Sequence, residues 1–404
     1  MNDCKDKLRI LYITEGFGSE FFGVSKVLMQ LTAYLSEHNV EYAISAAKLG
    51  NVPEGKREHV YELPIFPFSL RNNTFSRILR WHPGMYRSIR DRVREYKPNI
   101  IHVHGMLSPI QLIAVKIARA EKIPVIISAH GMLEPWTWRQ KGLLYYIFKR
   151  LYWNVFFKPV LKKTDYIHSI TGLEGKNLEG EFPNIEQIQI SNGVEQAEID
   201  EYVSPVIPDR YFLFLGRLHP KKGVDLLIRA FHKANLDRGW RLLIVGPDFD
   251  PHYSLTLRNL AVKLGIEDSV EFKGSIYGSE KRQLLLNAWV TVVPSHSEVV
   301  GLVNLESAVA FTPTITTHLT GLDNWGESGG ILINPEVDEL ASALSFAASW
   351  SLDERSEMGA KARRFVVDQY EWNVIGPKWI NAYEQIVHKH KSFYNTSEKN
   401  DPAK

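Results

Sequence analysis

The chain of 404 residues carries 48 Lys and Arg against 46 Asp and Glu, so its formal net charge is +2 with histidine neutral. This near-balance excludes a protein held to nucleic acid by bulk charge alone. Hydrophobic residues make up 44% and charged residues 23% of the chain. That composition is typical of a folded globular protein and excludes extensive disorder.

Short β-branched apolar runs alternate with longer amphipathic segments along the chain, a pattern that predicts parallel sheets with crossover helices. The clearest predicted strands are residues 10–14, 100–104, 125–128, 166–169, 211–215, 241–245, 270–272 and 290–293. Several of them end in glycine or a polar residue. Groups that bind ligands should therefore gather at the carboxyl ends of these strands.

Residues 195–210 interrupt the alternation. They are acidic, contain Pro205 and Pro208, and lack periodicity, as is typical of a linker. We therefore predict two doubly wound, Rossmann-like α/β domains, residues 1–203 and 204–372, whose strand ends line a cleft between them. Residues 373–404 are predicted to form a helix that returns to the first domain, followed by a polar tail.

Two cations lie in the turn between the strand 211–215 and the amphipathic helix that follows it. Gly216 and Arg217 end the strand, and Lys222 and Gly223 precede the helix. Unpaired N–H groups at a helix start add about half a positive charge, so this turn could bind a diphosphate. The alternative is that both are solvated loop cations, which is the commoner case for an isolated turn.

A second segment pairs two carboxylates with a helix start. Glu298 lies in a loop after the strand 290–293, and Glu306 follows eight residues later in a helix that begins near Gly301. The N–H groups of Gly301, Leu302 and Val303 would point at an anion, and the carboxylates could accept hydrogen bonds from sugar hydroxyls. Two surface carboxylates are the default interpretation. The nearby cationic turn favours a binding site instead.

The two segments together resemble the signature of retaining nucleotide-sugar glycosyltransferases of the group 1 type (family 4), which have the GT-B fold. The G-R-x(4)-K-G turn of that family matches residues 216–223, and its E-x7-E motif matches Glu298 and Glu306. Weaker motifs occur in the family's order at 22–23, 102–105, 128–131, 191–194 and 312–317. Residues 130–136 are similar to a subgroup that builds bacterial surface polysaccharides.

The resemblance implies a role for each matching residue. Arg217 and Lys222 would hold the donor diphosphate and neutralise the leaving group. Glu298 would bind the hydroxyls of the transferred sugar, Glu306 the ribose hydroxyls, and His130 would contact the sugar from the N-terminal domain. The further donor-binding residues are Gly23, Asn192, Gly216, Gly246, Gly274, Tyr277, Gly301, Leu302 and Val303, with the base placed near Gly274 and Tyr277.

The chain departs from the family pattern at three positions. Phe22 replaces the first glycine of the usual pair, which leaves Gly23 to let the backbone approach the phosphates without a Cβ. Val300 replaces a common phenylalanine, and Ser307 replaces an alanine. The first change puts the shape of the phosphate loop in question, and the other two are conservative.

The expected reaction is the retaining transfer of a hexose from a nucleotide diphosphate sugar to a glycan or lipid-linked glycan. A UDP-hexose is the favoured donor and GDP-mannose the second. The resemblance implies that the leaving phosphate accepts the proton of the acceptor, with no protein nucleophile, no cofactor and no obligatory metal. A double displacement through Glu298 is the alternative mechanism. An NDP-sugar epimerase of this fold and an inactive glycan-binding protein are the alternative functions.

Three patterns suggest other cofactors. Asp248-Phe249-Asp250 is a D-x-D, which can bind a metal and nucleotide, but it precedes Pro251 and is predicted to be a turn. His102, His104 and His130 lie at strand ends without carboxylate partners, which is unfavourable for a metal site. Gly16 and Gly18 lack the third glycine of a dinucleotide-binding turn.

Residues 136–163 contain nine aromatic and seven basic residues and no acidic one. Such a helix suits an anionic membrane surface, and a core-facing helix with solvated cations is an equal alternative. Residues 71–97 could extend the basic face. The chain has no apolar stretch of the roughly 20 residues that span a bilayer. Its first residues are expected to form a strand rather than a secretory signal, and Cys4 is the only cysteine. We expect a cytoplasmic protein, which the membrane alternative would place peripherally on the inner face of the plasma membrane.

Overall fold

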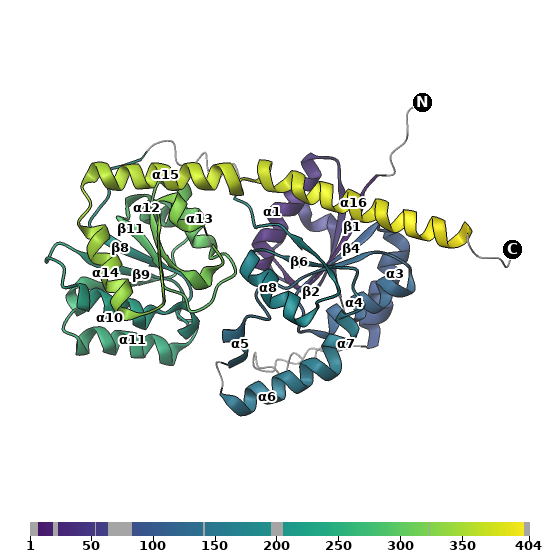
Figure 1. Ribbon diagram of the computed structural model, residues 1–404, viewed down its shortest axis with the longest axis horizontal. Coiled ribbons are helices and arrows are strands. Elements are labelled where there is room, and N and C mark those ends of the chain that lie inside the picture. The colour runs from purple at the N-terminus through teal and green to yellow at the C-terminus, as the bar shows by residue number, and fades with distance from the viewer. Residues whose placement is uncertain are drawn as a thin grey trace. The chain divides into compact units, whose positions relative to one another are not determined.

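The computed structural model describes residues 7–18, 23–52, 54–63, 83–139, 142–194, 205–322 and 324–399. The chain forms two compact units (Figure 1). Unit 1 comprises Met1–Gly193 and Ile375–Lys404, and unit 2 comprises Val194–Val374. The expected boundary between residues 203 and 204 lies outside the described residues.

Unit 1 contains a parallel sheet with the strand order β3-β2-β1-β4-β5-β6-β7. The strands are β1 (Arg9–Phe17), β2 (Glu41–Leu49), β3 (Val60–Glu62), β4 (Ile100–His104), β5 (Val125–Ser128), β6 (Tyr166–Ser169) and β7 (Glu186–Gln189). The helices between them are α1 (Val24–Glu37), α3 (Pro83–Tyr96), α4 (Pro109–Ala120), α5 (Pro135–Arg139), α6 (Leu143–Tyr152), a π-helix (Trp153–Phe157), α7 (Lys158–Leu161) and α8 (Gly172–Glu181).

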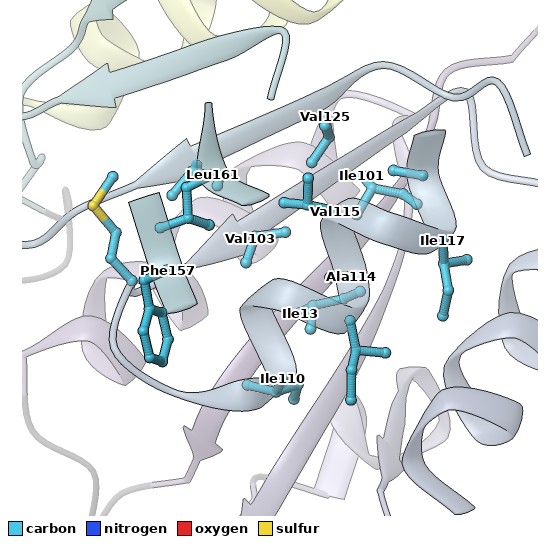
Figure 2. Packing of buried hydrophobic residues seen from close by; sticks show 14 of the residues in the cluster. Ile13, Ile101, Val103, Ile110, Ala114, Val115, Ile117, Val125, Phe157 and Leu161 are labelled. Atoms are coloured by element: carbon cyan, nitrogen blue, oxygen red, sulfur yellow. The ribbon is translucent and has the colours of Figure 1, made fainter. Parts of the chain in front are cut away.

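One face of this sheet carries the apolar core of unit 1. Ile13, Ile101 and Val103 point from β1 and β4 toward the apolar side chains of α4 (Figure 2). Phe157 and Leu161 belong to the same buried cluster. The β-branched strand residues and the i, i+3, i+4 spacing on α4 produce this packing, as the hydrophobic pattern predicts.

The opposite face of the sheet receives α16 (Trp372–Lys399). The Tyr383 hydroxyl lies 3.0 Å from that of Tyr12 on β1 and 2.8 Å from Nδ1 of His102 on β4. Gly376 lets this helix approach α1, since a Cβ there would lie 2.1 Å from the ring of Tyr34. The C-terminal segment from Ile375 onward is thus part of unit 1.

Unit 2 contains a second parallel sheet, with the order β10-β9-β8-β11-β12-β13. Its strands are β8 (Tyr211–Leu215), β9 (Arg241–Val245), β10 (Val270–Gly274), β11 (Val290–Val293), β12 (Thr314–Thr317) and β13 (Ile331–Ile333). Its helices include α10 (Val224–Ala234), α11 (Pro251–Lys263), α12 (Gly278–Asn287), α13 (Leu302–Val309), α14 (Val337–Ala348) and α15 (Leu352–Tyr370).

Both sheets are doubly wound, because the chain starts in the middle of each sheet, moves to one edge, and then returns to the other side of the first strand. The direction reverses between β1 and β4 in unit 1 and between β8 and β11 in unit 2. The predicted fold class is confirmed. In open α/β sheets, ligands bind at the carboxyl ends of the strands at such switch points.

Candidate functional site

At the switch point of unit 2, the turn after β8 lies against the loop after β11. His296 N–H donates to the carbonyl of Lys221 at 2.9 Å. Gly223 has φ +65°, and a Cβ on it would lie 2.2 Å from the carbonyl oxygen of Pro294. Only glycine fits this position, because both the backbone conformation and the space exclude a side chain.

Three of the predicted donor-binding glycines lie at the ends of neighbouring strands. Gly216 follows β8, Gly246 follows β9, and Gly274 ends β10. Gly246 N–H donates to the Gly274 carbonyl at 2.7 Å, and a Cβ on Gly246 would lie 1.8 Å from the Gly216 oxygen. The backbones at the ends of these three strands therefore approach one another closely next to the cationic turn.

The structure brings Lys222 and Glu298 into a direct ion pair across the switch point. Both side chains are largely buried, and the Ser295 hydroxyl lies 3.4 Å from the same carboxylate oxygen. Burial alone would raise the pKa of Glu298, but the charges of Lys222, Lys221 and Arg217 outweigh it and hold that pKa below its usual range. Glu298 is therefore a carboxylate at neutral pH.

Arg217 is exposed, and its guanidinium carbon lies 4.8 Å from the centroid of the Phe249 ring. Phe249 is the middle residue of the D-x-D sequence. Asp250 accepts hydrogen bonds from the N–H groups of His252 and Tyr253 and caps α11. This pattern is thus a helix cap, which confirms the predicted turn.

Glu306 has a partner that the sequence analysis missed. Its Oε2 lies 2.9 Å from Nζ of Lys281, and its side chain is 13% exposed. Lys281 lies in the first turn of α12. Tyr277 is the N-cap residue of that helix, and its side chain is 62% exposed and makes no capping hydrogen bond. No local sequence pattern links Lys281 to Glu306, because the two residues are 25 positions apart in the chain.

The predicted helix start near Gly301 is confirmed. Gly301 is the N-cap of α13 with φ +58°, and Leu302 and Val303 are the first helical residues. N–H groups in the first turn have no intrahelical acceptor. Asn304 N–H donates instead to the Gly301 carbonyl at 2.8 Å, which leaves the N–H groups of Leu302 and Val303 to face an anion near Glu298.

In unit 1, His130 lies just beyond β5 with φ +52°. Its Nε2 is 2.8 Å from Nδ1 of His104, the last residue of β4. Glu174 on α8 accepts the N–H of Gly131 at 2.6 Å and that of Ile170 at 2.7 Å. Burial raises the pKa of Glu174 to about 7. This carboxyl group fixes the turn that carries His130.

His102 on β4 is a core residue and is fully buried. Its Nε2 lies 2.7 Å from the Ser128 hydroxyl, which lies 2.7 Å from Nδ1 of His168. His168 Nε2 donates to the Ile190 carbonyl at 2.8 Å. Burial lowers the pKa values of His102 and of His168, the latter to about 4, so both rings are neutral at pH 7.

Two further predicted residues lie elsewhere in unit 1. Gly23 caps α1 with φ +75°, and a Cβ on it would meet no atom within 4 Å, so its conformation alone favours glycine. Its neighbour Phe22 lies outside the described residues. Asn192 is buried in the last loop of unit 1. Among the described residues, neither Gly23 nor Asn192 forms a hydrogen bond with His104 or His130.

The basic aromatic segment has two different faces. Trp138, Trp153, Phe157 and Leu161 are buried, and Lys149 is buried too, donating to the Thr137 carbonyl at 3.3 Å. Arg150 and Lys158 both pair with Glu181 on α8. An apolar stripe remains exposed on the other face: Leu143, Leu144, Ile147, Leu151 and Val155. The sequence leaves core and surface as alternatives. In the structure, one face of the segment packs in the core and the other face is exposed.

No helix within the described ranges combines the length and apolar character needed to cross a bilayer.

Two protein families match the chain. The family described as Glycosyltransferase Family 4 matches residues 22–198, and the family Glycosyl transferases group 1 matches residues 197–365. An uncharacterized glycosyltransferase from Methanocaldococcus jannaschii is 31% identical over 180 residues, which are 44% of this chain and 45% of that protein. The match thus spans less than half the length of this relative.

Solved structures share the fold over nearly the whole chain. The Anabaena protein HepE in complex with UDP and glucose has a TM-score of 0.72 at 16% identity, covering 94% of this chain and all of that one. WaaG, a glycosyltransferase involved in lipopolysaccharide biosynthesis, has a TM-score of 0.69 at 18% identity, covering 93% of this chain and 99% of that one. At these identities the likeness shows the fold, and the expected GT-B architecture is confirmed.

Proposed function

Because the chain belongs to the group 1 (family 4) glycosyltransferases, we propose that it transfers a hexose from a nucleotide diphosphate sugar to a glycan or polyprenyl-linked glycan, with retention of configuration. A UDP-hexose is the favoured donor and GDP-mannose the second. The observation that carries the proposal is the Lys222–Glu298 pair at the switch point of unit 2. The complex of HepE with UDP and glucose supports a uridine nucleotide.

The reaction needs positive charge where the leaving diphosphate gains negative charge. Lys222, exposed Arg217 and the start of α13 supply it in a partly buried setting, where such groups act more strongly than in water. In the absence of donor, Glu298 neutralises Lys222. Donor binding would let the ammonium turn to the phosphates and leave the carboxylate to accept sugar hydroxyls. The cations suffice for this role, so we propose a reaction without an obligatory metal or cofactor.

Two hydrogen-bonding groups complete the donor site in this proposal. Glu306, held by Lys281, would accept the ribose hydroxyls. His130 would contact the transferred sugar from unit 1. The cleft between the units stays a prediction.

The donor assignment can be tested by thermal shift, because a ligand that binds the native state raises the melting temperature. The full chain is mixed with UDP-, GDP- and ADP-sugars. We expect the largest shift with a UDP-hexose and none with Lys222→Ala. Equal shifts with all three nucleotides, or none, would contradict the assignment.

A radiolabelled transfer assay then separates the functions. A glycosyltransferase releases nucleoside diphosphate in proportion to labelled glycan and only when an acceptor is present. Conversion of the sugar without release of nucleotide would identify an epimerase. Binding of glycan without either product would identify an inactive glycan-binding protein.

We further propose that the apolar stripe of α6 and the π-helix rests on the cytoplasmic membrane surface, where a lipid-linked acceptor would lie. The stripe residues recur at helical spacing, and Leu144 is 85% exposed. Exposed Arg139, Lys162 and Lys163 lie in the same segment, which has no acidic residue, so its charge suits anionic lipid. The lipopolysaccharide role of WaaG is consistent with such an acceptor.

The membrane proposal is tested with phosphatidylglycerol vesicles. Leu144→Ser combined with Ile147→Ser and Leu151→Ser should abolish cosedimentation, whereas Leu255→Ser with Val262→Ser on the exposed face of α11 should not. Lys149 and Arg150 are unsuitable for substitution, because one is buried and the other pairs with Glu181. If the wild-type chain does not bind the vesicles, the stripe has another role.

A further inference from the structure

His104 and His130 share a single hydrogen bond at the carboxyl edge of the sheet of unit 1. The bond joins Nδ1 of His104 to Nε2 of His130 over 2.8 Å, and the ring planes differ by 19°. Burial lowers the pKa of His130 to about 3 and that of His104 well below its usual value, so both rings are neutral at pH 7. Between two neutral imidazoles, one nitrogen donates and the other accepts.

The direction of this bond follows from the other nitrogen of His104. Its Nε2 is buried and has no hydrogen-bond partner among the described residues. If His130 donated, His104 would carry its proton on Nε2, as a buried N–H without an acceptor. If His104 donates, Nε2 is only an unused acceptor. Buried N–H groups without a partner are rarer than unused acceptors.

A second set of histidines supplies a contrast within the same unit. His168 must donate from Nε2, because the Ile190 carbonyl can only accept. Ser128 then donates to Nδ1 of His168 and accepts from Nε2 of His102. His102 and His168 are therefore both protonated on Nε2, whereas His104 and His130 are protonated on Nδ1 if His104 donates.

We propose that His104 donates its Nδ1–H to His130 and thereby holds His130 as the neutral Nδ1–H tautomer. His104 is a positioning residue that acts only through His130. Nδ1 of His130 forms no hydrogen bond with any described residue, so it offers an N–H to a ligand oxygen, either a hydroxyl or a phosphoryl oxygen. The identity of that ligand as a nucleotide sugar rests on the proposed function.

The tautomer can be measured without any activity. In the full chain labelled with ¹⁵N-histidine, two-bond ¹H–¹⁵N spectra distinguish protonated from bare ring nitrogens, and loss of signals in His104→Asn and His130→Asn assigns the two rings. We expect His130 and His104 to be protonated on Nδ1, and His102 and His168 on Nε2. Protonation of His130 on Nε2 would overturn the proposal.

Kinetics test the consequence. His104→Leu removes the donor, and kcat should fall about tenfold, as expected for one lost hydrogen bond, with little change in the KM for the donor sugar. His104→Asn keeps an N–H in the position of Nδ1 and should restore most of the rate. His168→Gln, which lies in the same polar layer without touching His130, should leave kcat unchanged.

An equal loss in His104→Leu and His168→Gln would show a general packing effect and contradict the positioning role, provided that melting temperatures are matched. If the wild-type chain transfers no sugar from any donor, the proposed function fails. The spectra of the wild type and of His104→Asn still decide the role of His104.

Discussion

The two sheets have the same winding, yet the groups at their switch points differ. In unit 2, Lys222 and Glu298 form a buried ion pair beside the start of a helix. In unit 1, the strand ends carry neutral histidines that are hydrogen-bonded to each other or to hydroxyl groups. The charged switch point suits a diphosphate, and the neutral one suits sugar hydroxyls or other uncharged oxygens.

This contrast has an electrostatic reason. A buried ion pair is stable only while both partners are present, so it can respond to a ligand that replaces one of them. Neutral histidines avoid the cost of desolvating charge and give fixed, directional hydrogen bonds. One α/β winding therefore supports two binding chemistries, set by a few residues at the strand ends.

Removal of Lys222 should give the largest effect on activity. Lys222→Ala leaves the diphosphate without its buried cation and Glu298 without its partner, so kcat/KM should fall by about 10³ or more. Lys233→Ala removes an exposed pair with Asp338 in the same unit and should have almost no effect. Near-normal transfer by Lys222→Ala would remove the basis for calling the unit 2 switch point the donor site.

Acid should destabilise unit 1. His102, His104, His130 and His168 have folded pKa values below the unfolded value near 6.5, so the unfolded chain binds more protons and stability falls as the pH drops through 6.5. Four such groups together cost about 5.4 kcal/mol per pH unit. Glu174, with its pKa raised to about 7, offsets about 1.4 kcal/mol per unit, because its contribution to stability grows as the pH falls toward 4.5.

Hydrogen exchange resolved by mass spectrometry, corrected for intrinsic rates, can compare the units at pH 7.5 and 5.5. Protection in unit 1 should drop well before protection in unit 2. His168→Gln should reduce the net pH slope of stability by about a third, since it removes one of the four histidines whose cost Glu174 partly offsets. Equal loss of protection in both units would contradict the claim that buried neutral histidines make unit 1 more sensitive to acid than unit 2.

Glu306 should matter for nucleotide affinity more than for the chemical step. Glu306→Gln keeps the shape but removes the charge, so the Kd for UDP should rise about tenfold to a hundredfold by calorimetry. Glu271→Gln breaks an exposed pair with Lys273 and serves as the control. An unchanged Kd for UDP in Glu306→Gln would show that Glu306 does not bind the nucleotide.

The close approach of the turn at Gly223 to the loop at Pro294 can be tested with two glycines of similar backbone conformation. Gly223 has φ +65° and Gly265 has φ +67°, but only at Gly223 would a Cβ meet the Pro294 oxygen, at 2.2 Å. Gly223→Ala should lower the free energy of unfolding by about 2 kcal/mol more than Gly265→Ala. Equal destabilisation in denaturant titrations would show that the turn and the loop are not in contact.

The sequence predicted the central strands well and the outer ones poorly. Strands β4, β5, β6, β8, β9 and β11 have the predicted bounds, because each is a short apolar run buried in a sheet. Strands β2 and β12 were not among the clearest predictions, since β2 contains three alanines and β12 consists mostly of threonine. Strand β7 was missed because it is largely polar and lies at a sheet edge, where pairing with β6 rather than local pattern makes it a strand.

The sequence alone determined the family, the doubly wound fold, the cationic turn and the two acids, because all of these are local patterns or fixed spacings. Tertiary structure alone decided which polar side chains meet. Lys281 and Glu306, or His104 and His130, are 25 and 26 residues apart in the chain. Such partners depend on which strand ends and helices become neighbours in the folded sheet. Short-range periodicity in the sequence does not predict these neighbours. The same holds for the segment after Trp136, where burial of one helix face determined which cations are structural and which apolar side chains remain exposed.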